Sequence, residues 1–245
     1  MHPPAAVRAD CPHHLRRPLL RQRWVDVDFA HWPVPIGDVG ALLPPGLEPD
    51  TFDGTAWISL VPFWMRDLRV RGLPPIPTTR DFAEVNVRTY VRGPHGPGVW
   101  FFSLDATEAL PVATARTVYG LPYFRARVDH LVTPGPRGPT VAWAVRRRGS
   151  AAQGRLAVER GVIAAQDPLA VFLTARWRLY AGTRHVHTAM VEHEPWPLFV
   201  SEPIECDPGL VDAAGLRVDG APITHWSPGV HVAAGRPRRV ARPGV

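Results

Sequence analysis

The sequence contains no lysine, so that all 28 of its basic residues are arginine. Because arginine stays protonated, no side chain can form a Schiff base, and no phosphate-binding loop with its lysine can exist. The two cysteines, Cys11 and Cys206, are too few for a disulfide framework. No apolar run reaches the roughly 18 residues of a membrane-spanning helix, and no signal segment opens the chain. These absences predict a soluble cytoplasmic protein with no membrane partner.

The formal net charge of +6 raises the question of nucleic-acid binding. Most of this charge lies at the ends of the chain, since residues 1–23 and 234–245 carry +4 each and residues 24–233 carry −2. A nucleic-acid-binding domain gathers its basic residues on a folded face, so no specific nucleic-acid partner is expected. An interaction protein whose arginine-rich tails contact acidic partners stays open.

Local patterns predict one domain, residues 22–233, between two disordered basic tails at 1–21 and 234–245. Clusters of proline and glycine separate short segments with the pattern of β-strands. Strands are expected at 56–63, 82–91, 98–104, 140–146, 155–162 and 185–193, and helices at 35–43, 111–119 and 167–180. The predicted fold class is α+β, a curved antiparallel sheet (a cone or partial barrel) with a few flanking helices.

The strand at 84–91 alternates strictly between polar and apolar residues. One face carries Glu84, Asn86, Arg88 and Tyr90. In the next strand, a regular alternation would place Ser103 with Phe101 and Asp105. Two interpretations stay open: a sheet with one face in water, or a polar stripe that faces an enclosed pocket. Since Asn86 is the only asparagine of the chain, its presence on this stripe favours the pocket.

Several motifs carry a family resemblance. They are FAHW (29–32), LLPPGL (42–47), DGTAW (53–57), EVNVRTYV (84–91), GVWFFSLDA (98–106), AR (115–116), GLPY (120–123), DPL (167–169) and PWPL (195–198). Together they resemble the YqjF-like bacterial family of unknown function over about residues 22–233. That family is grouped with acetoacetate decarboxylase, so the resemblance implies a curved antiparallel sheet that forms a cone around an internal site.

The resemblance also suggests a set of site residues. In acetoacetate decarboxylase, a helix that contains arginine leads into Gly-aromatic-Pro-Lys, and the lysine is the nucleophile. Here Arg116 falls in the corresponding helix, and Tyr123 stands where the lysine would be. Glu84 resembles the glutamate of that family. We therefore expect Glu84 and Tyr123 to be the catalytic pair, with Arg88 and Arg116 holding a substrate carboxylate.

The other residues assigned to substrate binding are Asn86, Tyr90, Ser103, His193 and Trp196. The last two follow from the family motif alone. His185 and His187 share a strand face, and a metal site there would need a third ligand such as Glu192 or Glu194. Strand pairs of this kind more often line a surface or a pocket, and no cysteine joins them, so no metal and no other cofactor is expected.

The leading hypothesis is an internal polar pocket for a small organic acid or carbonyl compound. Glu84 and Tyr123 would there catalyse proton transfer, dehydration or isomerisation without a Schiff base. The alternative is a non-catalytic ligand-binding or sensing protein that has lost the lysine nucleophile. A structural interpretation, in which Tyr123 fills the cone and Arg116 pairs with Glu84, has equal standing. Assembly into a homo-oligomer stays open.

Overall fold

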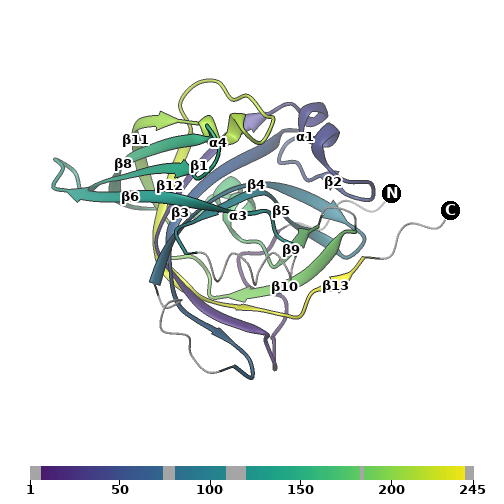
Figure 1. Cartoon of the computed structure of the whole chain (residues 1–245). Helices are drawn as coiled ribbons and strands as arrows, with labels where there is room; N and C mark the ends of the chain where they lie inside the picture. Colours follow the sequence, from purple (N-terminus) through teal and green to yellow (C-terminus); the bar gives the residue numbers. More distant parts are fainter. Residues whose placement is uncertain (1–6, 74–80, 109–119, 183–184, 241–245) are drawn as a thin grey trace.

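The computed structural model describes residues 7–73, 81–108, 120–182 and 185–240 (Figure 1). The strands are β1 (Leu20–Val34), β2 (Glu48–Pro49), β3 (Ala56–Val70), β4 (Asp81–Gly93), β5 (Gly96–Ala106), β6 (Tyr123–Thr133), β7 (Thr140–Arg147), β8 (Gln153–Ala164), β9 (Arg178–Ala181), β10 (His187–His193), β11 (Phe199–Asp207), β12 (Ile223–Ala234) and β13 (Arg238–Arg239). The helices within these residues are α1 (Ile36–Leu42), α3 (Pro168–Thr174) and α4 (Gly209–Asp212). The predicted fold class is confirmed: a curved, mostly antiparallel sheet with a few short helices.

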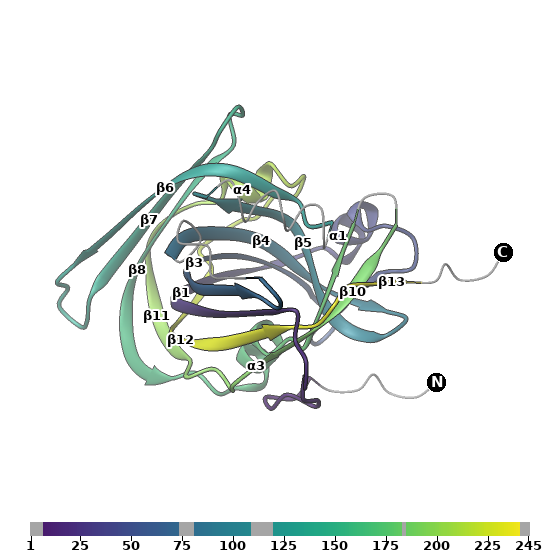
Figure 2. The same ribbon diagram turned by 60° about the horizontal axis from the view of Figure 1, so that its bottom comes forward.

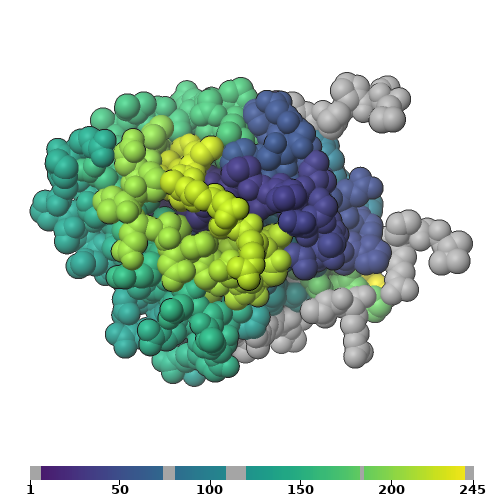
Figure 3. All heavy atoms as spheres, turned by 90° about the horizontal axis from the view of Figure 1, so that it is seen from above, coloured from purple at the N-terminus to yellow at the C-terminus, as the bar shows by residue number. Residues whose placement is uncertain are grey.

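The sheet contains strands that are far apart in the sequence. Its order is β13-β10-β9-β5-β6-β7-β8-β11-β12-β1-β3-β4-β2, and additional pairings join β10 to β12 and β5 to β4. These extra pairings curl the sheet back on itself, and the strands curve around an interior in Figure 2. The first and last long strands, β1 and β12, pair along eleven residues and lie side by side on the surface in Figure 3.

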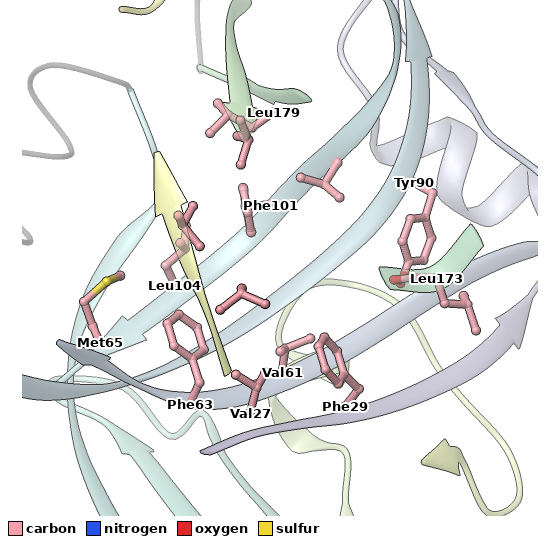
Figure 4. Close-up of a cluster of buried hydrophobic side chains, with 14 of the residues drawn as sticks. Val27, Phe29, Val61, Phe63, Met65, Tyr90, Phe101, Leu104, Leu173 and Leu179 are labelled. Atoms are coloured by element: carbon pink, nitrogen blue, oxygen red, sulfur yellow. The ribbon is translucent and has the colours of Figure 1, made fainter. Parts of the chain in front are cut away.

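Strands β1, β3 and β4 form a wall with a hydrophobic cluster on each face. Phe29, Phe63 and Tyr90 belong to the cluster inside the curve, where Figure 4 shows them. Val85 and Val87 belong to the other cluster, which β7 and β8 help to cover. The alternating strand β4 is therefore buried on both faces, and the interpretation with one face in water is wrong.

The predicted helices have three outcomes. The helix expected at 35–43 is confirmed as α1, whereas the one expected at 111–119 lies outside the described residues. The helix expected at 167–180 begins as predicted, because the Asp167 side chain caps it by accepting from the Ala170 amide. It is wrong beyond Thr174, because from Arg178 onward the chain pairs with β5 and β10 as strand β9. Sheet pairing overrides the helical period there.

The described parts of the two basic tails differ from the disorder that their composition predicts. The Arg8 carbonyl accepts a hydrogen bond from Trp177 Nε1 at 2.9 Å, and the Leu15 amide donates to Glu192 at 2.6 Å. At the other end, β12 extends to Ala234 and β13 pairs with β10. Side chains of Trp177 and Glu192 at one end, and strand pairing with β10 at the other, thus order these segments. No helix in the described ranges is long and apolar enough to cross a membrane.

Candidate functional site

A cavity of about 90 Å³ lies inside the curved sheet. Its walls are mainly apolar and include Met65, Phe101, Leu104 and Leu179, which Figure 4 shows around the same interior. Its polar lining includes Glu84, Asn86, Arg88, Tyr123, Arg176 and His193. An apolar lining with a few convergent polar groups is the usual pattern of a small-molecule site.

Glu84 and Tyr123 meet at one end of this cavity. Tyr123 Oη donates a hydrogen bond of 2.8 Å to Glu84 Oε2, and the glutamate is only 2% exposed. Burial raises the pKa of Glu84 from 4.5 to about 8, although the Tyr123 hydrogen bond opposes part of that rise. Glu84 is therefore a neutral carboxylic acid at pH 7. Burial, followed by the neighbouring glutamate, also raises the pKa of Tyr123 well above its usual value.

A tight turn delivers Tyr123 to this position. Gly120 adopts a φ of 65°, and a Cβ there would lie 3.3 Å from the Gly182 Cα, so the turn favours glycine. The Pro122 carbonyl then accepts from the Leu104 amide at 3.0 Å, which starts the parallel pairing of β6 with β5. The motif GLPY thus fixes the phenol against the β4 wall.

Arg88 lies on the same face of β4, four residues beyond Glu84. It is 3% exposed, and its Nη2 donates to the Leu173 carbonyl at 3.1 Å. Its guanidinium lies 5.7 Å from the centre of the Phe29 ring. Among the described residues, no acidic side chain forms an ion pair with Arg88, and its Nε has no hydrogen-bond partner. A buried cation in this condition favours an anionic ligand.

Arg176 is a second buried arginine in the lining, and it was not among the residues predicted from the sequence. Its Nη1 donates to Asp50 Oδ2 at 2.6 Å, while Nη2 has no partner among the described residues. Asp50 also pairs with Arg92 at 2.7 Å. A signal existed in the sequence, because Arg176 follows Phe172 by four residues and would interrupt the apolar face of the predicted helix.

The C-terminal end of α3 fixes several of these side chains through its last three carbonyls, at residues 172–174. The first accepts from Arg176 Nε (2.8 Å), the second from Arg88 Nη2 (3.1 Å) and Tyr90 Oη (2.7 Å), and the third from Trp196 Nε1 (3.1 Å). Tyr90 and Trp196 are absent from the cavity lining. They support the residues that form the lining. The direct substrate contact predicted for Tyr90 and Trp196 from the sequence therefore does not agree with their positions outside it.

His193 lines the cavity with a fixed orientation. Its ring lies 4.3 Å from that of Trp177 and 5.1 Å from that of Trp196, measured between centroids. Its Nδ1 is 2.6 Å from the Glu194 carbonyl oxygen. Burial lowers the pKa of His193 to about 4, so the ring is neutral at pH 7.

Residues 21–231 match the DUF2071 family, which is described as an uncharacterized conserved protein. The chain belongs to this family. The DUF2071 chain is 38% identical over 215 residues to the uncharacterized protein YqjF of Bacillus subtilis (strain 168), an alignment that covers 85% of this chain and 87% of the relative. The resemblance drawn from the motifs is confirmed.

Solved structures similar to this DUF2071 chain share its fold. The enduracididine biosynthesis enzyme MppR, complexed with pyruvate, has a TM-score of 0.67 at 16% identity, covering 99% of this chain and 100% of that one. Acetoacetate decarboxylase from Legionella pneumophila has a TM-score of 0.65 at 12% identity, covering 95% and 93%. At these identities the comparison shows an acetoacetate-decarboxylase-like fold.

Ser103 is a correction to the predicted site of the DUF2071 chain. In the pairing of β4 with β5, Val87 lies opposite Ser103 but Arg88 lies opposite Phe101, so one extra residue forms a β-bulge. The bulge shifts the alternation, which leaves Phe101 in the cavity lining and Ser103 outside it. Ser103 Oγ instead donates to Asp105 Oδ2 at 3.0 Å, away from the cavity.

The other predicted site residues of this DUF2071 chain either line the cavity or lie outside the described residues. The predicted residues that the structure brings to the cavity are Glu84, Asn86, Arg88, Tyr123 and His193. Arg116 lies outside the described residues. Asn86 is buried, and its Oδ1 has no partner within the described part of the chain. In that same part, no three His, Cys, Asp or Glu side chains gather into a metal-ligand set.

Proposed function

We propose that this protein binds a small organic acid inside the curved sheet and transfers a proton at the end of the ligand opposite its carboxylate. The observation that carries the proposal is the buried Arg88, which has no acidic partner among the described residues. A carboxylate beside it would compensate the cost of burying this charge. Glu84 and Tyr123, on the same side of β4, supply the acid at the other end.

Arg88 and Arg176 offer the carboxylate several donors. Arg176 leaves Nη2 and Arg88 leaves Nε without a hydrogen-bond partner among the described residues. Asp50 neutralises part of the charge on Arg176, so Arg88 carries the larger unbalanced charge. Charge-assisted hydrogen bonds from a guanidinium to a carboxylate are about twice as strong as neutral ones, and burial strengthens them further.

Glu84 supplies the proton. As a neutral acid it donates its proton to a carbonyl oxygen or to a departing hydroxyl group of the ligand, while Tyr123 hydrogen-bonds the carboxylate that forms. The Glu84 carboxylate then takes a proton from a ligand carbon next to the carbonyl. The acid is thereby restored, and the net result is isomerisation or loss of water. No Schiff base is needed, in agreement with the absence of lysine.

The structure of MppR with pyruvate supports the choice of a first test ligand. Pyruvate is a three-carbon oxo acid, and a cavity of about 90 Å³ is of the order of three water volumes. A small carboxylate of this size would extend from Arg88 toward Glu84.

Calorimetric titration with pyruvate and acetate tests the carboxylate site. We expect Arg88→Met to lower the affinity for both at least about tenfold, because it removes a charge-assisted hydrogen bond. The control Arg127→Met removes an exposed arginine of β6 and leaves both affinities unchanged. Equal binding by Arg88→Met and the unmodified protein contradicts the proposal.

The non-catalytic ligand-binding or sensing function is the second candidate. The sequence resemblance supports it in one respect, because it aligns Tyr123 with the position of the nucleophilic lysine in acetoacetate decarboxylase. Deuterium exchange at the methyl group of pyruvate, followed by NMR in heavy water, separates the candidates. Exchange that depends on Glu84 supports proton transfer, whereas binding without exchange supports a sensor.

A further inference from the structure

We infer that the ligand of this cavity carries a hydroxyl group on the carbon next to its carboxylate, and that this hydroxyl donates a hydrogen bond to His193 Nε2. The inference rests on the carboxylate site of the proposed function and adds the substrate class: a 2-hydroxy acid, or the enol form of a 2-oxo acid. In both, the oxygen on the second carbon bears a proton.

The hydrogen bond of His193 to the main chain fixes which ring nitrogen bears the proton. Nδ1 is 2.6 Å from the Glu194 carbonyl oxygen, and a carbonyl oxygen only accepts, so Nδ1 is the donor. In a neutral ring Nε2 is then an acceptor only. Protonation of Nε2 is disfavoured by burial and by the positive charge of Arg88, while the Glu194 side chain and carbonyl oppose these effects only in part.

The ring of His193 cannot easily exchange its two nitrogens. Trp177 and Trp196 pack against it, and Trp196 is itself anchored by its hydrogen bond to the Thr174 carbonyl. A flip would break the bond to Glu194. The acceptor therefore keeps one direction, and within the described residues no hydrogen-bond donor is recorded for Nε2.

His193 belongs to the carboxylate end of the cavity. It lines the same cavity as Arg88, and it lies close enough for the guanidinium charge to influence its titration. The guanidinium groups of Arg88 and Arg176 line this side of the cavity and act only as donors, and the same lining also includes Asn86, Thr174 and Gln22. A carboxylate satisfies these donors, and only a ligand donor close to that carboxylate satisfies His193.

This arrangement discriminates between oxidation states of the second carbon. The carbonyl oxygen of a 2-oxo acid would face the acceptor Nε2 with its own lone pairs, whereas a 2-hydroxy acid supplies a proton. One neutral hydrogen bond contributes about 1 kcal/mol net, and an unpaired buried acceptor adds to the difference. We therefore expect a preference of about tenfold for the hydroxy acid.

Calorimetric titration with lactate, pyruvate and propionate at pH 7 and fixed ionic strength tests this inference. The three acids share a carbon skeleton and differ only at the second carbon. Both lactate enantiomers are measured. In the unmodified protein we expect the enantiomer with the higher affinity to bind about tenfold more tightly than pyruvate. His193→Phe should abolish this preference while leaving the propionate affinity within about twofold.

Two further variants complete the experiment. His193→Gln retains a side-chain oxygen acceptor, so part of the lactate preference should return. His95→Phe changes an exposed histidine in the turn between β4 and β5 and should leave all three affinities unchanged. Circular dichroism spectra and thermal unfolding establish that each variant is folded before its affinities are compared.

The possible failures are distinguishable. The inference is overturned when pyruvate binds the unmodified protein as tightly as lactate, or when His193→Phe weakens all three acids equally. The carboxylate site of the proposed function would still stand in both cases, provided that Arg88→Met weakens all three acids. When no acid binds, or when Arg88→Met changes nothing, the proposed function and this inference fail together.

Discussion

Asp28 and Arg88 are both buried in the wall of β1, β3 and β4, on opposite faces, and their partners differ sharply. Away from the cavity, Asp28 accepts hydrogen bonds from Arg160 at 3.0 and 2.8 Å and from Trp143 at 2.7 Å. On the cavity face, Arg88 has a main-chain carbonyl as its partner and no acid among the described residues. The same wall therefore carries one fully paired charge and one that lacks its counterpart.

A pair of carboxylates, Asp105 and Glu84, repeats the contrast. Asp105 accepts from Arg147 at 2.7 and 2.9 Å, outside the cavity, whereas Glu84 on the cavity face accepts from a phenol. The two groups lie on adjacent strands, and the Asp105 charge contributes to the raised pKa of Glu84. Charges are thus paired with opposite charges on the face away from the cavity, whereas on the cavity face Arg88 and Glu84 have only neutral partners among the described residues.

The largest effect is expected from Arg160→Met, on the face of the wall away from the cavity. It leaves Asp28 buried without its cation, so we expect the free energy of unfolding to fall by about 3 kcal/mol or more. Ligand affinity in the cavity should stay within about twofold, because Arg160 lies on the other face of the wall. Urea unfolding and calorimetric titration measure the two effects.

A matched control comes from an exposed ion pair. Arg155 contacts Glu205 at 3.1 Å with both side chains more than half exposed. Arg155→Met should change the free energy of unfolding by no more than about 0.5 kcal/mol. Equal losses for Arg155→Met and Arg160→Met would contradict the assigned role of the buried pair.

On the cavity face, Glu84→Gln should change how the free energy of unfolding depends on pH. Folding raises the Glu84 pKa from 4.5 to about 8. Between these values the folded protein holds a proton that the unfolded chain has lost, so this contribution is complete below pH 4.5 and disappears as the pH rises toward 8. Glutamine has no such proton. The variant should therefore lose this part of the pH slope and become more stable than the unmodified protein near pH 8.5, by an amount of order a few kcal/mol.

Urea unfolding at pH 5, 6, 7 and 8.5 follows this effect in both proteins. An unchanged pH slope in Glu84→Gln would mean that Glu84 is ionised in the folded protein at neutral pH. General acid chemistry by Glu84 would then be ruled out.

Tyr123→Phe should have a smaller effect than Arg160→Met or Glu84→Gln. It removes one hydrogen bond of 2.8 Å, so the loss of stability at pH 7 should be about 1 kcal/mol. Because that bond holds the Glu84 pKa down, the pKa should rise further in the variant, detectable by NMR titration of the glutamate carboxyl. A fall in the Glu84 pKa would show that Tyr123 does not act as a donor to its ionised form.

The sequence alone could predict the site residues that lie on a regular strand. Glu84, Asn86 and Arg88 could be assigned to one face because a strand has a period of two residues, and the structure brings all three to the cavity. Tyr123 could be placed only through the resemblance to acetoacetate decarboxylase, since its approach to Glu84 depends on a parallel pairing of β6 with β5 that no local sequence pattern indicates.

The rest depended on irregularities and long-range pairing. One extra residue in β5 turns Ser103 to the other face, and such a bulge leaves no clear mark in the sequence. Arg176 was missed because an apolar period suggested that the helix continues, whereas sheet pairing ends it at Thr174. Which of two periods prevails depends on neighbours that a single sequence does not reveal.

The C-terminal end of α3 has a consequence for how this protein can evolve. Its three terminal carbonyls hold Arg88, Arg176 and Trp196 at once, and Trp196 packs on His193. A substitution far from the ligand, such as one at the capping Asp167, would shift all of these contacts together. Related proteins could thus acquire new ligand preferences in one mutational step, with every residue that touches the ligand conserved.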